Sequence, residues 1–489
     1  MSKSTGTKNG WKAVHRRQEV KITRNCSILF LFISIAQALI LAAGCGKKPP
    51  DVILIMIDTL RADHLSCYDK ESIHTPNIDS MAEDGFLFGN IHCSAPTTLA
   101  STSSLMTSLH PRMHGAARNG FVLDNSLLTL PEVFRERGYS TAAFIASFAL
   151  HSSTGIDQGF SYFDERFTST LKSAVLQRRA EDVNDAVTGW LEAAPSRPLF
   201  LFIHYFDPHQ PYQPPAPYDQ PSDSLNAPGI TGSMEEVKSL RGYLARGGDV
   251  DDRVRRMHEL YVGEIHYTDR AVGDLITLLE RKKLYDSSLI IFTADHGETF
   301  WEHPRRESLD HGYTVYETTT HVPLIIRWPG KIQPGRSDIL ASNIDIAPTI
   351  LDLIGMDIPE AFQGRSLKGV IGGETVSEIP VYSEATKPHE EIELEVPFRN
   401  DRKAKCIISG RWKLIWVPFM QDHEELYDIF KDPLETTNLI SKMHDEKMTG
   451  NMRHLLRGWA AEVSEVAKNR PVVMDEETRK KLEALGYIQ

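Results

Sequence analysis

The sequence has no excess of basic residues and little cysteine. It carries 54 Lys and Arg against 66 Asp and Glu, a formal net charge of -12. Because nucleic-acid phosphates are held chiefly by clustered Lys and Arg, this balance disfavours nucleic acid as a partner. Three of the five cysteines, Cys67, Cys93 and Cys406, follow residue 49, and this odd, widely spaced set predicts no disulfide framework. The sequence also has no low-complexity tracts and no short repeats. A chain of 489 residues is long enough to bury a large core.

Residues 1–49 are typical of a targeting segment. A basic lead from position 12 to 24 precedes an apolar run at 28–43, which is short for a membrane span. The run ends in "LAAGCGKKPP", whose small residues before Cys45 resemble the lipobox of bacterial lipoproteins. Lipidation at Cys45 would leave the chain exported and anchored by lipid in the bacterial cell envelope. An uncleaved anchor and ordinary secretion are the alternatives, and all three export the rest of the chain.

From Asp51 onward, continuous apolar runs alternate with amphipathic segments. Such runs are typical of strands that are covered on both faces, and helical spacing is found at 130–137 and 265–282. The alternation predicts an α/β fold with a doubly wound, mostly parallel sheet over residues 50–375. The runs are "VILIMI", "TAAFIA", "LFLFIHYF", "SLIIFTA" and "VPLIIRW".

Two further segments differ in composition. Residues 214–252 are rich in Pro, Gly, Asp and Ser and are interpreted as a long insertion or lid. After an acidic, loop-like stretch at 373–397, "KCIISGRWKLIWV" and "ELYDIF" indicate short strands followed by helices. Residues 376–489 are therefore expected to form a smaller C-terminal α+β domain.

Three of the apolar runs lead directly into side chains that bind metals or protons. In an open parallel sheet, the loops at the carboxyl ends of the strands gather around the ligand crevice, so these side chains are expected to meet. Carboxylates with imidazole suit a divalent cation, which can neutralise the charge that builds on a tetrahedral oxyanion ester. One such Asp alone is more often a helix cap or turn residue, but here three runs coincide. The side chains are Asp58 after the first run, His204, Asp207 and His209 in or after the third, and Asp295 and His296 after the fourth.

A hydroxyl-rich stretch at 90–115, "NIHCSAPTTLASTSSLMTSLHPRMHG", offers several nucleophiles. Within it, "SSLMTSL" is interpreted as the first turns of a helix whose N-terminal amides would hold an anionic oxygen. The alternative is a helix cap rich in Ser and Thr with no chemistry. Beside a metal site, the nucleophile interpretation is favoured.

Eight segments, in this order along the chain, resemble the sulfatases of the alkaline phosphatase superfamily. The resemblance runs from about residue 51 to 438. It implies an alkaline-phosphatase-like fold and a metal-dependent hydrolase of sulfate or phosphate esters, because the superfamily handles both. The segments are "DVILIMIDTLRADHLSCYD", "TPNIDSMAEDGFLF", "SLMTSLHPRMHG", "YFDPHQPY", "FTADHGE", "YETTTHVPLIIRWPG", "NIDIAPTILDLIG" and "ELYDIFKDPLETTNL".

The resemblance also restricts the choice of nucleophile. True sulfatases carry Cys-x-Pro-x-Arg, whose cysteine becomes formylglycine, but the proline after Cys93 comes one position late and no matching arginine follows, so no formylglycine is expected. In the family the nucleophile lies nine residues before the threonine of a "Leu-Thr-Gly" turn, matched here at position 107, and this spacing selects Thr98. Thr98 resembles the threonine-nucleophile branch of the family, although Ala100 and Thr102 replace that branch's proline and histidine. An unmodified alcohol favours attack on phosphorus over attack on a sulfate ester.

The resemblance assigns roles to individual residues. Asp58, Asp295 and His296 match the family's metal ligands, with the Thr98 oxygen completing the set and Ca, Mn or Zn as the expected divalent ion. His209, in a His-x-Pro motif, is the expected general acid for the leaving alcohol, since the ordinary pKa of histidine suits that work. A histidine that only caps a loop is the alternative.

The roles of four further side chains are predicted from the residues around them in the sequence. His311 lies near the family's basic substrate-binding residue and is expected to contact the non-bridging oxygens of the ester. His204 lies inside a predicted strand and is expected to be structural. His114 and Arg118 match no motif and are expected to be ordinary surface residues.

The sequence therefore predicts an exported, metal-dependent hydrolase or transferase of phosphate or phosphonate esters with a threonine nucleophile. A true sulfuric ester hydrolase with an unmodified hydroxyl is the first alternative. A surface binding protein that keeps the fold without catalysis is the second. These residues do not indicate whether the alcohol part of the ester is a small molecule, a glycan or a lipid. They do not indicate the oligomeric state either.

Overall fold

The computed structural model describes residues 48–167, 178–221, 227, 229–303, 306–387, 402–443, 445–469, 476 and 480. The predicted targeting segment, including Cys45, lies outside the described residues. The described residues from Pro50 onward form one compact unit. Among the residues described, no helix is both long and apolar enough to span a membrane.

A nine-stranded, mostly parallel sheet forms the centre of this unit, and the five apolar runs of the sequence form β1, β3, β5, β6 and β7. Its order is β4-β3-β5-β1-β6-β7-β2-β8, with β9 paired to β2. Strand β7 runs antiparallel to both of its neighbours. The bounds are β1 Val52–Ile57, β2 Phe86–His92, β3 Ser140–Phe144, β4 Tyr162–Asp164, β5 Leu199–Tyr205, β6 Leu289–Ala294, β7 His321–Arg327, β8 Gly335–Ser337 and β9 Ala341–Ser342.

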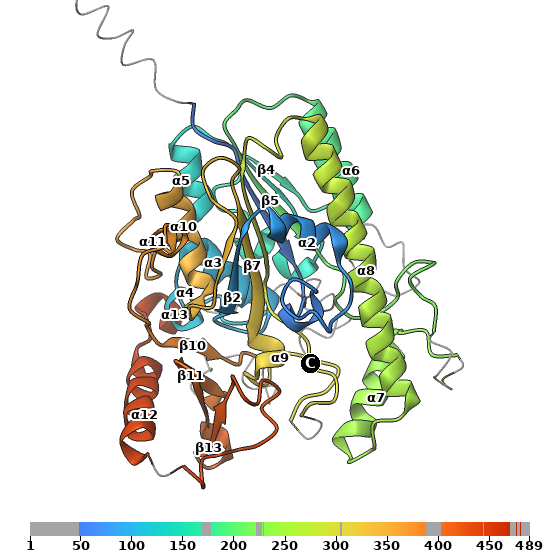
Figure 1. Cartoon of the computed structure of the whole chain (residues 1–489), viewed down its shortest axis with the longest axis vertical. Helices are drawn as coiled ribbons and strands as arrows, with labels where there is room; N and C mark the ends of the chain where they lie inside the picture. The colour runs from blue at the N-terminus through green and yellow to red at the C-terminus, as the bar shows by residue number, and fades with distance from the viewer. Residues whose placement is uncertain are drawn as a thin grey trace, which may run out of the picture. The chain divides into compact units, whose positions relative to one another are not determined.

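Helices cover both faces of this sheet, as a doubly wound fold requires. Helices α6 and α8 lie on one side of it, and α3, α5 and α10 lie on the other (Figure 1). Every residue of β1 is buried, since the sheet is covered on both faces at its centre. The helix bounds are α2 Pro76–Glu83, α3 Thr98–Thr107, α4 Pro111–His114, α5 Leu130–Glu136, α6 Ala180–Glu192, α7 Met234–Ala245, α8 Asp252–Arg281, α9 Glu317–Thr320, α10 Ile346–Leu353, α11 Lys368–Ile371, α12 Glu446–Ala461 and α13 Glu465–Asn469.

A second, antiparallel sheet of four strands follows in the order β10-β11-β12-β13, with α12 packed against it (Figure 1). Buried ion pairs tie it to the rest of the unit. Arg112 in α4 pairs with Glu384 at 2.8 Å, and Lys413 pairs with Glu317 at 2.8 Å. The predicted fold class is confirmed, whereas the proposed boundary at residue 375 stays a prediction. The strand bounds are β10 Val381–Glu384, β11 Lys405–Ser409, β12 Trp412–Val417 and β13 His423–Asp428.

The segment interpreted as an insertion or lid contains a helix that its composition did not predict. Helix α7 begins after Ser233, whose side chain accepts from the backbone of Glu236 while the Glu236 side chain accepts from the backbone of Ser233. This capping box satisfies amides that would otherwise be unpaired at the helix start. Val237, Leu240 and Leu244 are buried, so α7 is packed into the fold.

Candidate active site

The strands that lead into the predicted site are neighbours. β1 lies between β5 and β6 and runs parallel to both, with Ile57 opposite Tyr205 on one side and Ala294 on the other. Asp58 and Asp295 are the next residues of β1 and β6, so the two carboxylates leave the sheet at the same edge. The structure therefore brings Asp58 and Asp295 together, as the sequence predicted for the residues that follow these strands.

The two carboxylates are fully buried and differ in their partners. Asp295 Oδ1 accepts hydrogen bonds from the backbone N–H of Thr59 at 3.1 Å and of His296 at 2.7 Å. Asp295 Oδ2 and both oxygens of Asp58 have no hydrogen-bond partner among the described residues. Thr59 adopts a left-handed backbone with φ of 56°, unusual for a β-branched residue, and this turn directs its N–H at Asp295.

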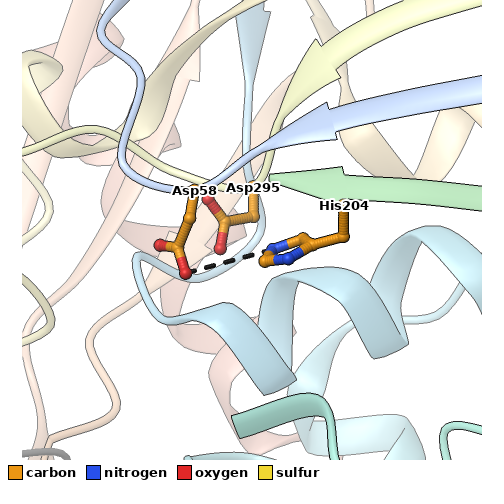
Figure 2. A group of neighbouring side chains, drawn as sticks. All are labelled: Asp58, His204 and Asp295. Atoms are coloured by element: carbon orange, nitrogen blue, oxygen red, sulfur yellow. Dashed lines mark ion pairs between the residues drawn. The ribbon is translucent and has the colours of Figure 1, made fainter. Parts of the chain in front are cut away.

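Two imidazoles face these carboxylates. The Nδ1 of His296 lies 2.9 Å from the carbonyl oxygen of Gly297, where it can donate, and this leaves Nε2 3.4 Å from Asp295 Oδ2 and 3.8 Å from Asp58 Oδ1. His204 Nε2 lies 3.9 Å from Asp58 Oδ2. Figure 2 shows the Asp58 and Asp295 carboxylates and the His204 ring converging from the ends of three adjacent strands. One ligand atom from each of these three residues lies within 4.8 Å of the others, so the group can hold a metal ion.

The electrostatics of the cluster fit a bound cation. Burial, followed by the negative charge of Asp295, raises the pKa of Asp58 well above its usual range, and the nearby Thr98 hydroxyl opposes that rise. Burial lowers the pKa of His296 to about 4 and that of His204 to about 3, so both rings are neutral near pH 7. Neutral imidazoles and deprotonated carboxylates are what a divalent metal binds. A cation here would also relieve the repulsion between two buried carboxylates.

Thr98, the predicted nucleophile, is the first residue of α3. The helix begins at Thr98 with Thr97 as its N-cap residue, so the prediction that its first turns lie at "SSLMTSL" is wrong by about one and a half turns. Thr98 Oγ1 is buried and has no hydrogen-bond partner within the described part of the chain. The hydroxyl therefore lies at the positive end of a helix, beside the Asp58 carboxylate.

The hydroxyl groups behind Thr98 hold α3 in place rather than offering more nucleophiles. Ser101 Oγ donates to the carbonyl of Asp295 at 2.6 Å, and Asn343 donates to Ser101 Oγ at 2.9 Å. Ser104 Oγ lies 2.9 Å from His114 Nε2. His114 is completely buried and Arg118 is 1% exposed, so the prediction that both lie on the surface is wrong. His114 contacts a hydroxyl of α3, whereas the guanidinium of Arg118 lies over the ring of Phe121, and the sequence motif could reveal neither contact.

His209 and His311 line the same site. The rings of His296 and His311 lie 4.3 Å apart between centroids, and those of His311 and His209 lie 5.1 Å apart. His209 Nδ1 lies 2.6 Å from the carbonyl oxygen of Gln210 and donates to it, which directs Nε2 away from the loop. His311 Nδ1 lies 3.3 Å from Glu298 Oε1. Burial lowers the pKa of both rings well below the usual value.

Cys93 lies just after β2, in surroundings that do not activate a thiol. Its Sγ is buried and donates weakly to the carbonyl of Thr319 at 3.6 Å. Burial, together with the charge of Asp295, raises the pKa of this thiol well above its usual value. A buried thiol of this kind is inert.

The structure adds His204 to the cluster, although the sequence analysis treated it as structural. It is the second-to-last residue of β5, opposite Met56, close to the carboxyl end where ligands gather. Its position near the carboxyl end of a predicted strand is the sequence feature that could have indicated a role in the site. Asp207, in contrast, pairs with Arg179 at 2.8 Å and accepts from the backbone of Ala180, so it supports the start of α6.

This mixed sheet, with a metal-competent cluster at its carboxyl edge, has the alkaline-phosphatase-like α/β fold. The sulfatase family model matches residues 50–356, and a model described as the C-terminal part of N-sulphoglucosamine sulphohydrolase matches residues 309–462. The chain belongs to the sulfatase family, whose members generally bind a divalent metal.

Individual relatives span most of the chain. An arylsulfatase from Clostridium perfringens is 26% identical, covering 83% of this chain and 93% of its own length. A solved structure of a protein with its substrate D-glucosamine-2-N,6-O-disulfate is 20% identical, with a TM-score of 0.69, over 88% of this chain and all of its own. The phosphonate monoester hydrolase of Silicibacter pomeroyi is 23% identical, with a TM-score of 0.66, over 84% of this chain and 94% of its own. At these identities the two structures support the fold alone.

The raised pKa of Asp58 predicts that one substitution changes the stability of the cation-free protein and that of the cation-loaded protein in opposite directions. Because burial raises the Asp58 pKa above its unfolded value, ionising this carboxyl costs stability as the pH rises past the ordinary Asp range. Asp58→Asn should therefore raise the Tm of the chelator-treated protein at pH 7 by a few degrees. A divalent ion at about 100 times its Kd should stabilise the wild type by about 2.7 kcal/mol and the variant by much less. Thermal unfolding with and without Mn²⁺, Ca²⁺ or Zn²⁺ measures both effects.

Asp345→Asn is the matched control. Burial also raises the pKa of Asp345, to about 6, but its oxygens accept from the backbone of Ser342 at 2.9 Å and Arg365 at 2.7 Å, away from the cluster. This variant should keep the ion-induced rise in Tm. An equal rise in wild type and Asp58→Asn would show that the ion binds elsewhere.

Proposed function

We propose that the chain is a metal-dependent hydrolase, or transferase, of phosphate or phosphonate esters that uses Thr98 as its nucleophile. The observation that carries the proposal is the buried Thr98 hydroxyl, at the start of α3 and beside the Asp58 carboxylate, which has no hydrogen-bond partner among the residues that the structure describes. Asp58, Asp295, His296 and His204 would hold the ion. When bound, the ion supplies positive charge that lowers the pKa of the Thr98 hydroxyl and offsets charge on the transferred group.

The protein side chains then account for two steps. Thr98, having lost its proton to solvent, attacks phosphorus through Oγ1 while the bond from phosphorus to the alcohol oxygen breaks. His209 gives a proton to that departing oxygen. Water, or another alcohol in a transfer reaction, next attacks the phosphothreonine and restores the free hydroxyl.

The role of His209 depends on the bound substrate. In the structure Nδ1 donates to Gln210, and burial keeps the pKa low, so Nε2 carries no proton. An anionic ester close to the ring favours its protonated form, which raises the pKa toward neutrality and prepares Nε2 to donate.

Sulfate esters are the second candidate substrate, and the family itself favours them. The Clostridium relative is an arylsulfatase, and the disulfated glucosamine is the substrate of the structural neighbour. An unmodified Thr98 would then attack sulfur. The two candidates share the site and differ in the central atom of the ester.

We further propose export and lipid attachment at Cys45, on the strength of the lipobox-like "LAAGC" before that residue. In a bacterial host that lipidates proteins, the full chain should sediment with membranes, and Cys45→Ser should move it to the soluble exported fraction. Fractionation followed by immunoblotting measures this. Recovery of both forms in the same fraction would contradict lipid anchoring.

Thr98→Ala should lower kcat/KM by at least about 1000-fold on the ester class that the wild type prefers, because the attacking atom is lost. Thr98→Ser and Cys93→Ala are the controls, since the first keeps a hydroxyl and the second removes only the buried thiol. Matched aryl sulfate, phosphate monoester, phosphate diester and phosphonate substrates are assayed with added Mn²⁺, Ca²⁺ or Zn²⁺.

The same assay separates the alternatives. Turnover of the sulfate alone would replace the phosphate proposal with the second candidate. Loss of activity in Cys93→Ala but not in Thr98→Ala would reverse the assignment of the nucleophile. A wild type that is inactive on every ester would favour the binding-protein alternative.

His209→Gln should show a dependence on the leaving group. Loss of a general acid lowers the rate by about 100-fold or more for an alkyl alcohol, which needs a proton to depart. A nitrophenolate leaves without one, so its rate should change much less. Steady-state kinetics on a series of aryl and alkyl esters measures the dependence. Equal losses across the series would mean that His209 has a role other than proton donation.

A further inference from the structure

The three residues that follow β10, Ala385 to Lys387, lie between the two segments that carry Thr98 and His311. Thr386 Oγ1 is 2.7 Å from Thr97 Oγ1, and Thr97 directly precedes Thr98. The backbone N–H groups of Thr386 and Lys387 both donate to the carbonyl of Gly312, each at 2.9 Å, and Gly312 follows His311. The C-terminal sheet therefore contributes directly to the wall of the active site.

This segment is held in place from the side of β10 as well. Glu384, the last residue of β10, donates its N–H to the carbonyl of Ser94 at 3.0 Å and pairs through its side chain with Arg112. Gly312 leaves room for the contact, since a Cβ there would come within 2.8 Å of Thr97 Cγ2 and 2.9 Å of Lys387 Cγ. Its φ of 99° also disfavours any residue with a side chain.

Lys387 brings a positive charge into this position. The residue is 4% exposed, and its Nζ pairs with Asp310, the neighbour of His311. Nζ also lies 5.5 Å from the centre of the Tyr313 ring. The charge is close enough to act on His209, His296 and His311, the three rings that line the site.

Asp310 alone does not neutralise the positive charge of Lys387. Its second carboxylate oxygen pairs with Arg241 of α7 at 2.8 Å, so one carboxylate serves two cations. An ammonium group has three N–H donors, and Asp310 accepts one of them. Among the described residues, Asp310 is the acceptor for Lys387 Nζ, so the ammonium group has further N–H donors for an anion bound in front of Thr98.

We propose that Lys387 binds the non-bridging oxygens of the tetrahedral oxyanion ester, so that a residue of the loop after β10 completes the substrate site. The inference rests on the proposed ester hydrolysis and adds a contact to it. His311 then shares this work with Lys387 rather than performing it alone. Asp310 and Gly312 act as positioning residues that aim the ammonium group.

The test measures anion binding apart from turnover. Inorganic phosphate and sulfate are titrated calorimetrically into the metal-loaded full chain, and KM and kcat are measured on the ester that the wild type cleaves. Lys387→Met should weaken binding of the preferred anion by about 10- to 100-fold, as expected for one lost charge-assisted hydrogen bond. It should also raise KM. Lys387→Gln, which keeps a donor for Asp310, should show the same direction of change if Lys387→Met folds poorly.

Lys368→Met is the matched control. Lys368 pairs with Asp352 through the same kind of contact, at 2.8 Å, but lies on the surface, so anion binding and KM should stay unchanged. Folding of each variant is checked by its Tm and by the ion-induced rise in Tm.

Two outcomes would overturn the inference. If the wild type cleaves esters through Thr98 while both Lys387 variants bind the anion and substrate like the wild type, Lys387 is no substrate ligand and the proposed function stands. If the wild type neither cleaves an ester nor binds phosphate or sulfate, both proposals fall together.

Discussion

Two like charges buried side by side are the constraint on which the site depends. Asp58 and Asp295 leave adjacent parallel strands at the same edge of the sheet, and both are completely buried. Neither pairs with Lys or Arg, and three of their four oxygens have no hydrogen-bond partner among the described residues. Buried carboxylates in this state are costly unless they are protonated or bound to a cation. The neutral rings of His204 and His296 complete a donor set of the kind that divalent metals prefer.

The surrounding structure is arranged around that cluster. Helix α3 starts at its edge, so the Thr98 hydroxyl lies next to Asp58, and Ser101 ties the helix to the backbone of Asp295. On the opposite side, the C-terminal sheet reaches the same point through Thr386 and Lys387. In the proposed reaction, the hydroxyl of Thr98 at the start of α3 is the attacking group. Cys93 is buried, and burial raises the pKa of its thiol.

Local patterns in the sequence predicted five strands of the main sheet, β1, β3, β5, β6 and β7, but not β2, β4, β8 or β9. The apolar run of β1 places Asp58, and that of β6 places Asp295 and His296, at the carboxyl edge of the sheet. The loops that follow neighbouring parallel strands lie at the same edge. Helix α7 was missed because Pro and Gly around it dominate the composition, whereas its start depends on a capping box at Ser233. The start of α3 was placed too late because its hydroxyl residues, which usually cap helices, are buried and bonded within this one.

Contacts between distant segments could not be predicted from local patterns. His114 was expected at the surface, but it packs against Ser104 on the helix that carries the nucleophile. Lys387 lies 289 residues after Thr98, and it is the hydrogen bond between Thr97 and Thr386 that brings the two together. No periodicity or motif connects such positions.

The account is tested most directly by mass spectrometry of the Thr98 peptide after the metal-loaded enzyme has been quenched in acid during turnover of a phosphonate or phosphate ester. The account predicts a peptide that carries the transferred phosphoryl or phosphonyl group on Thr98, with Cys93 unmodified. A group on any other residue, or formylglycine at Cys93, would contradict it.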